Sequence, residues 1–150
     1  MIQGKWYKPG APLEDAVLPV RLAVFGRGRD AMDDESWNAC VYWDGLPVAA
    51  GRIWWKEDAF WLGDIGVLEE FRSRRLGDLV LRLLLFKAQS HAAREVRLLS
   101  PAETAGFFAR MGLAPVSAGV SDPVEMALAG SDIDLDTCKS CRKTDCPNRR

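Results

Sequence analysis

Apolar and polar residues alternate at short intervals along most of the chain, and the spacing predicts a succession of strands and helices. Residues 2–7 predict a first strand, which should end at Lys8-Pro9-Gly10. Residues 13–25 roughly fit a helical stripe. Pro19 should kink or split that helix, because proline lacks the N–H group that a helix interior uses.

Three strands are expected next, over residues 37–43, 47–55 and 59–68. Asp44-Gly45, between the first two, is a strong signal for a tight hairpin turn. The second and third strands are apolar on both faces, which is typical of strands that helices cover on both sides.

The clearest helix spans residues 76–90, where a narrow polar stripe interrupts an otherwise apolar surface. A strand over 95–99, a short helix over 102–111 and two strands over 113–116 and 124–128 complete the pattern. This order of elements predicts an α/β (α+β) layered domain.

Length and composition fit one folded domain. The chain has 150 residues, of which 48% are hydrophobic and 27% charged, and this balance excludes wholesale disorder. All the predicted elements fall within residues 1–130. The pattern stops at Ser131, and residues 131–150 are expected to form a basic tail that carries cysteines.

Charge and hydropathy narrow the class of partner. The net charge of −1 argues against a globally basic nucleic-acid-binding protein. The amino terminus lacks the apolar segment of a signal peptide, and no apolar run reaches the ~20 residues of a membrane span. We therefore expect a cytoplasmic protein that binds neither membrane nor nucleic acid.

The segment from Arg72 to Gly77 joins a predicted strand to the longest predicted helix, and it carries three arginines. A helix amino terminus presents free N–H groups and the positive end of the helix dipole, so this loop is a candidate phosphate site. Gly77 would let a ligand approach the first helical turn closely. A solvated basic turn that only caps the helix is the alternative interpretation.

These residues resemble the GCN5-related N-acetyltransferase (GNAT) superfamily, whose motif is Q/R-x-x-G-x-G/A at the start of a long helix. Val67 matches the end of the preceding strand, Glu70-Phe71 match the loop, and Arg72 and Gly77 match the ends of the motif. Arg75 stands where the first glycine of the motif belongs. A second segment, Gly106-Phe107-Phe108-Ala109-Arg110-Met111-Gly112-Leu113, resembles the family's F-Y-x-x-x-G-F signature.

The resemblance implies a mixed, mostly antiparallel central sheet with helices on both faces. It also implies acetyl-CoA as the co-substrate, an amine of a small molecule or peptide as the acceptor, and a possible homodimer. The pyrophosphate would bind the N–H groups of residues 74–78, and the pantetheine arm would lie beside Val67, where Gly66 could accommodate a bulge. The residues implied in cofactor binding are Val67, Leu68, Arg72, Ser73, Arg74, Arg75, Leu76, Gly77, Asp78 and Phe108.

The proton acceptor of the reaction is expected to be a carboxylate. Asp64, three residues before Val67, is the first candidate for the general base, with local hydrogen bonding as its alternative role; Glu103 and Glu57 are weaker candidates. Phe108 occupies the position where many family members have a proton-donating tyrosine, and it has no hydroxyl. A catalytically weak or silent acyl-CoA-binding regulator is therefore the alternative to an active enzyme. The single histidine, His91, is interpreted as structural.

The cysteines gather at the end of the chain. Cys138, Cys141 and Cys146 include a C-x₂-C pair, a spacing that suits zinc or an iron–sulfur cluster. Cys40 could supply a fourth ligand if the tail folds back, or a second chain could supply it. A disordered tail, a disulfide and a redox pair are the alternatives.

The chain also has six tryptophans, several of them on the predicted central strands. Packing against the sheet is one interpretation of these side chains, and an aromatic wall around the acceptor pocket is the other.

Overall fold

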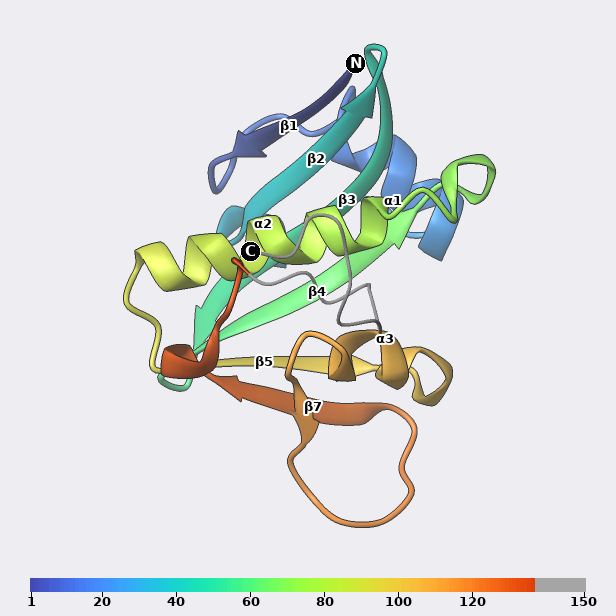
Figure 1. The fold of residues 1–150 in the computed structure, drawn as a ribbon. Helices are drawn as coiled ribbons and strands as arrows, with labels where there is room; N and C mark the ends of the chain where they lie inside the picture. The colour runs from blue at the N-terminus through green and yellow to red at the C-terminus, as the bar shows by residue number, and fades with distance from the viewer. Residues whose placement is uncertain (137–150) are drawn as a thin grey trace.

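The computed structural model describes residues 1–136 and has one seven-stranded sheet with the strand order β1-β2-β3-β4-β5-β7-β6 (Figure 1). Only β4 and β5 pair in parallel, so the sheet is mixed and mostly antiparallel, as predicted. The strands are β1 Ile2–Tyr7, β2 Trp37–Trp43, β3 Leu46–Lys56, β4 Ala59–Val67, β5 Glu95–Ser100, β6 Ala114–Pro115 and β7 Val124–Ala129.

Residues 1–136 also form three α-helices and four short 3₁₀ segments. The α-helices are α1 Val17–Phe25, α2 Leu76–Ser90 and α3 Ala105–Ala109. The 3₁₀ segments are η1 Ala31–Asp34, η2 Glu69–Phe71, η3 Ala102–Thr104 and η4 Gly130–Asp132. None of the helices in residues 1–136 is both long and apolar enough to cross a bilayer.

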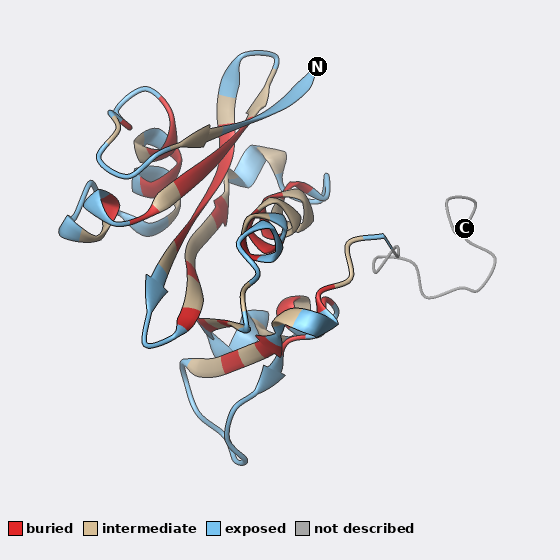
Figure 2. Cartoon of the chain, turned by 90° about the vertical axis from the view of Figure 1, so that its left-hand side faces the viewer, coloured by how far each residue is buried: buried red, intermediate tan, exposed pale blue. Residues whose placement is uncertain are grey.

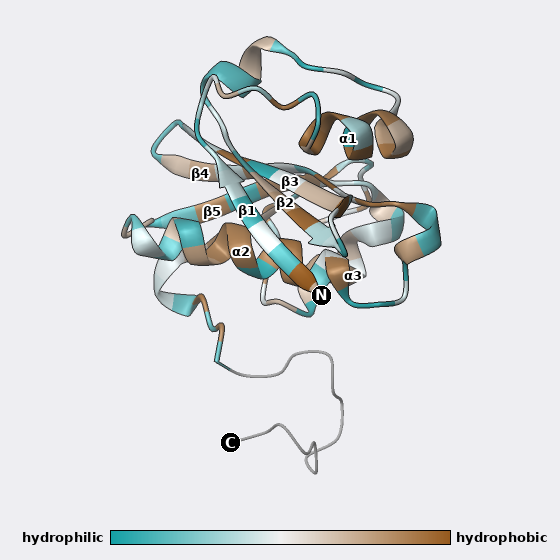
Figure 3. Ribbon diagram, turned by 90° about the horizontal axis from the view of Figure 1, so that it is seen from above, coloured by the Kyte–Doolittle hydropathy of each residue, from teal (hydrophilic) through white to brown (hydrophobic). Residues whose placement is uncertain are grey.

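The two faces of the sheet carry different helices: α1 lies over one face, and α2 and α3 lie over the other (Figure 3). The main core forms between α2 and the sheet, where α2 buries Val80, Leu81, Leu84, Leu85 and Ala88 (Figure 2). A smaller core lies under α1 and contains Leu13, Ala16, Val17, Val20, Cys40 and Ala50. The strands that read as apolar on both faces are thus covered on both faces.

Beyond a short stretch, β4 and β5 part from each other. Their parallel pairing joins only Phe60–Leu62 to Val96–Leu98, after which β4 runs on to Val67 alone on that side (Figure 1). The gap between the two strands opens toward the loop that leads into α2.

The first predicted helix differs from the observed one. The helix begins at Val17 instead of Leu13, and Pro19 lies in its first turn. The first N–H groups of a helix have no partner within the helix, so a proline there removes no hydrogen bond and causes no kink. Leu13 instead forms a turn that places its side chain in the smaller core, with 1% of its surface exposed.

The first residues of the expected tail pack onto the domain. Ile133 is buried and Leu135 packs beside the main core. Gln89 Nε2 donates to the Ile133 carbonyl at 3.3 Å, and Arg82 Nη1 donates to the Leu135 carbonyl at 3.1 Å. Residues 131–136 therefore lie against α2.

The tail cysteines Cys138, Cys141 and Cys146 lie outside the described residues, and their metal site stays a prediction. Cys40 is fully buried under α1. Burial raises the pKa of its thiol to about 12. Cys40 is enclosed by apolar residues in the described part of the chain, and its role as a fourth ligand, like the tail site itself, stays a prediction.

Candidate functional site

A pocket of about 390 Å³ opens at the amino terminus of α2, between the loop after β4 and α3. Its lining residues are Val67, Arg72, Ser73, Arg75, Leu76, Gly77, Asp78, Phe107, Arg110 and Met111. The structure thus brings together most of the residues that the sequence predicts for cofactor binding. Leu68, Arg74 and Phe108 are outside the lining, and Phe107, Arg110 and Met111 are additions.

The loop into α2 is held in an unusual backbone conformation. Ser73 and Arg75 have φ angles of 68° and 62°, in the left-handed region that favours glycine. Arg75 is the residue that precedes the helix, and its carbonyl accepts the hydrogen bond from Leu79 N at 3.1 Å. Arg75, at the place of a motif glycine, therefore adopts a conformation that favours glycine, at a cost of about 1 kcal/mol or more.

The pocket presents positive charge at a helix terminus. The first turn of a helix has N–H groups without partners in the helix, and Leu76, Gly77 and Asp78 of this turn line the cavity. Arg72, Arg75 and Arg110 line it as well, and within residues 1–136 none of these three forms an ion pair. Such a site favours an anion with several charges.

Apolar side chains form another part of the wall. A Cβ atom at Gly77 would lie 3.6 Å from Phe107 Cζ and 3.7 Å from Val67 Cγ2, so both side chains lie beside this glycine. Met111 completes this apolar part. The pocket therefore suits a ligand that has both anionic and apolar parts.

Arg74 and Phe108 point elsewhere. The Arg74 guanidinium lies over the rings of Trp43 and Phe71, at 4.9 Å and 5.0 Å from their centres. Phe108 is 8% exposed and packs in the main core, edge-on to Phe107 at 5.0 Å. Phe108 therefore lies behind the lining residue Phe107, and Arg74 lies over two rings that are not part of the lining.

Phe107, Arg110 and Met111 share one face of the second signature segment. They are separated by three and four residues, which is the spacing that brings side chains together on a helix. Phe108, which follows Phe107 in the chain, turns toward the core. The helical period applied to this segment would have found all three lining residues.

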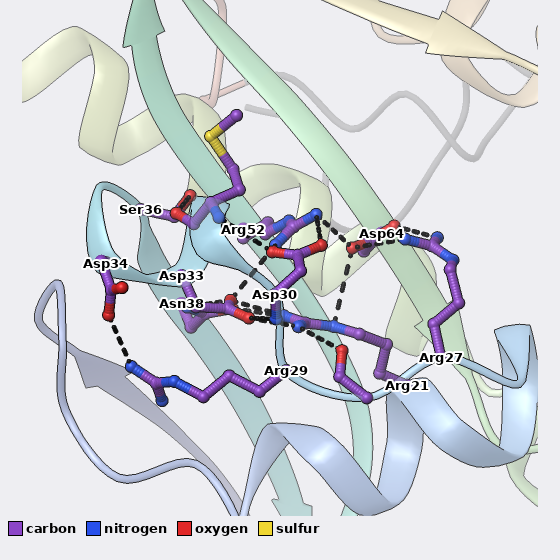
Figure 4. A network of polar contacts seen from close by, with 12 residues as sticks. Arg21, Arg27, Arg29, Asp30, Asp33, Asp34, Ser36, Asn38, Arg52 and Asp64 are labelled. Atoms are coloured by element: carbon purple, nitrogen blue, oxygen red, sulfur yellow. Dashed lines mark hydrogen bonds and ion pairs between the residues drawn. The ribbon is translucent and has the colours of Figure 1, made fainter.

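Asp64 lies on the α1 face of the sheet, on β4, in a group of polar contacts (Figure 4). Its carboxylate accepts from Arg27 and forms ion pairs with Arg52 Nη2 at 3.0 Å and Arg21 Nε at 3.6 Å. Its oxygens are thus already engaged by guanidinium groups, which corresponds to the local bonding that the sequence analysis gives as the alternative to a base.

The weaker acid–base candidates are not part of the pocket. Glu103 is exposed in η3 and is absent from the lining. Glu57 lies in the turn between β3 and β4, at the opposite end of β4 from Val67. His91 follows the last turn of α2, where its ring lies 6.0 Å from that of Phe60.

Comparison with known proteins agrees with this geometry. The sequence profile of the acetyltransferase (GNAT) family matches residues 6–113, which include both the α2 loop and α3. The chain belongs to the GNAT family. This GNAT protein is accordingly an acyltransferase. A search of the curated proteins by sequence finds no match.

Solved structures show the same GNAT fold. ElaA from Escherichia coli is 21% identical with a TM-score of 0.72, and the match covers 85% of this chain and 99% of that one. An acyl-CoA N-acyltransferase from Pseudomonas aeruginosa is 18% identical with a TM-score of 0.76, over 86% and 100% of the two chains. A GNAT family acetyltransferase from Elizabethkingia anophelis, solved with acetyl-CoA bound, is 11% identical with a TM-score of 0.65, over 85% and 97%.

Proposed function

We propose that this protein transfers an acetyl group from acetyl-CoA to an amine of a small molecule or peptide. The observation that carries the proposal is the pocket at the α2 terminus, where three arginines and the first helical turn meet an apolar wall. Phosphates would bind the helix N–H groups and the guanidinium groups of Arg72, Arg75 and Arg110. The pantetheine arm would pass Val67, where β4 has no neighbour on the β5 side.

The reaction would be a direct attack. The neutral amine nitrogen forms a bond to the acetyl carbonyl carbon, the carbon–sulfur bond breaks to release CoA as a thiolate, and the nitrogen gives up one proton to water to become the amide. A backbone N–H beside the carbonyl oxygen would stabilise the charge that develops there. Phe108 cannot supply a proton, so water would protonate the thiolate.

Gly77 gives a test that leaves the fold intact. A Cβ at this position meets only ordinary contacts with the protein, and alanine is the better helix former, so Gly77→Ala should fold at least as well as the parent. The added methyl group would nevertheless lie in the cofactor's path. We expect calorimetry to show acetyl-CoA affinity about tenfold lower or worse.

Gly106→Ala is the matched control, because Gly106 is a helical glycine with open space around it. It should bind acetyl-CoA like the parent. A parent protein that does not bind acetyl-CoA, or a Gly77→Ala variant that binds it as tightly as the parent, would refute the proposal.

Phe108 favours a second candidate, an acyl-CoA-binding protein with little or no turnover. A screen that measures thiol release from acetyl-CoA over a broad panel of amines separates the two functions. Turnover with any amine that exceeds the amine-free rate establishes the enzyme, and binding without turnover across the panel favours the silent protein.

A further inference from the structure

The pairing of β3 with β4 contains one extra residue on β4. Ala50 pairs with Gly66 and Arg52 pairs with Gly63, so β3 advances by two residues where β4 advances by three. Asp64 within this bulge has a φ of 50°, in the left-handed region. A bulge of this kind usually has glycine in that conformation, because other residues adopt it at a cost.

The bulge decides which face the following residues occupy. Leu62 is buried on the α2 face, whereas Gly63, under the Trp54 ring, and Asp64 both lie on the α1 face. Side chains of a regular strand alternate, so two consecutive residues on one face mark the extra residue.

Alternation then resumes in the opposite phase. Ile65 lies beside Gly51 under α2, Gly66 lies under Val24 and Phe25 of α1, and Val67 again faces α2. Without the extra residue, every side chain from position 64 onward would change face. Val67 would then turn away from the pocket that it lines.

A chain of ion pairs fixes Asp64 to three other parts of the fold (Figure 4). Its direct partners are Arg21 of α1, the half-exposed Arg27 of the loop that follows α1, and Arg52 of β3. Asp33 of η1 holds the two buried partners in turn, through Arg21 Nη1 at 2.7 Å and Arg52 Nη1 at 3.2 Å.

The centre of the network is almost closed to solvent. Arg21 is 2% exposed, Asp33 1% and Arg52 6%. Asn38 of β2 also accepts from Arg21 Nη2 at 2.9 Å, so the network reaches a third strand of the sheet, beside β3 and β4. A carboxylate fixed in this way can hold its own backbone in a conformation that the residue would otherwise leave.

We propose that Asp64 is a positioning residue: its carboxylate, held by Arg21, Arg27 and Arg52, maintains the β4 bulge and so turns Val67 toward the cofactor pocket, and it does not accept the proton of the amine. The inference rests on the proposed function, since it concerns the arm of acetyl-CoA that would pass Val67. By this inference, ion pairs on the α1 face of the sheet influence the binding of acetyl-CoA on the α2 face.

Glycine separates positioning from proton transfer, because it adopts a positive φ without a carboxylate. We expect Asp64→Ala to bind acetyl-CoA about tenfold more weakly than the parent and Asp64→Gly to stay within about threefold of the parent. Adenosine bisphosphate, the nucleotide half of CoA without the pantetheine arm, should bind both variants like the parent. Asp34→Asn is the charge control, since Asp34 pairs with the exposed Arg29 and, within residues 1–136, with none of the partners of Asp64.

The pH profile of thiol release is the second readout, measured for Asp64→Gly with an amine that the parent acetylates. If Asp64 only positions the strand, Asp64→Gly should turn over with the same pH profile as the parent. If Asp64 is the base, Asp64→Gly should lose turnover, together with the fall in rate at acidic pH that titration of the base causes. The inference would be overturned if Asp64→Ala bound acetyl-CoA like the parent, or if Asp64→Gly lost turnover. The result for Asp64→Gly remains decisive even if Asp64→Ala does not fold. A parent that binds neither acetyl-CoA nor adenosine bisphosphate would instead refute the proposed function.

Discussion

On the α2 face of the sheet the packing is aliphatic, whereas on the α1 face a small apolar core lies next to a buried group of charges. Val80, Leu84 and Leu85 of α2 meet the strands without a polar partner. Under α1, Arg21, Asp33 and Arg52 are nearly as buried, but they form ion pairs with one another (Figure 4).

The two kinds of packing do different things. Burial of aliphatic surface stabilises the fold but tolerates repacking by other apolar side chains of similar volume. Buried ion pairs contribute little net stability, yet they require one geometry, because an unpaired charge inside the protein is costly. The aliphatic face therefore supplies most of the stability, and the charged face fixes the positions of α1, η1 and β4.

The largest effect should come from breaking the charged group at its centre. Asp33→Asn removes the carboxylate that holds both Arg21 and Arg52, and we expect a loss of about 3–5 kcal/mol in the free energy of unfolding. Urea denaturation measures the loss. Asp34→Asn next to it, at an exposed site, should change stability by less than about 0.5 kcal/mol. A loss below about 1 kcal/mol for Asp33→Asn would contradict a geometric role for the network.

Acid should distinguish the two faces. Burial alone would raise the pKa of Asp33, but hydrogen bonds from Arg21 and from the Asp30 backbone, with the charges of Arg21 and Arg52, hold that pKa well below its usual range. The stability that Asp33 contributes is therefore complete above its unfolded pKa of about 4 and is lost as the pH falls further.

We expect the parent to lose about 2 kcal/mol more than Asp33→Asn between pH 5 and pH 2, measured by denaturation at each pH. Leu84→Ala is the control from the aliphatic face. It should cost about 3 kcal/mol at every pH and keep the parent's pH dependence. If the free energy of unfolding fell equally with pH in Asp33→Asn and in the parent, Asp33 would be ruled out as the source of the acid sensitivity.

A smaller effect concerns the strained loop that serves the pocket. Arg75→Gly should be more stable than Arg75→Ala by about 1 kcal/mol, the reverse of the usual order, because the φ of 62° favours glycine. Thermal unfolding of the two variants measures the difference. Both variants lose the guanidinium and should bind acetyl-CoA equally weakly, so alanine controls for the lost charge. Equal stabilities would show that Arg75 is not strained.

The sequence predicts the regular elements well because each depends on its own local pattern. The limits of β2, Trp37–Trp43, and α2, Leu76–Ser90, agree with the predicted ranges. The loop from Arg72 to Gly77 was predictable for the same reason, since motif and helix start are neighbours in the chain.

The charged group was not predictable from local pattern. Arg21, Asp33, Asn38, Arg52 and Asp64 come from five different elements, and each alone resembles an ordinary surface residue. Their burial depends on how α1 and η1 pack on the sheet, which is a long-range property. The bulge at Asp64 is equally hidden, because only the pairing with β3 reveals the extra residue.

The enclosed thiol of Cys40 makes the α1 face observable by chemistry. With its surface covered by Leu13, Val17 and Val20 and its pKa raised to about 12, it should resist alkylating reagents while α1 stays in place. In a chain whose other three cysteines are replaced by serine, the rate of alkylation measures how often α1 opens. Because α1 carries Arg21, the same rate would also report how often the ion pair between Arg21 and Asp64 in the β4 bulge is broken.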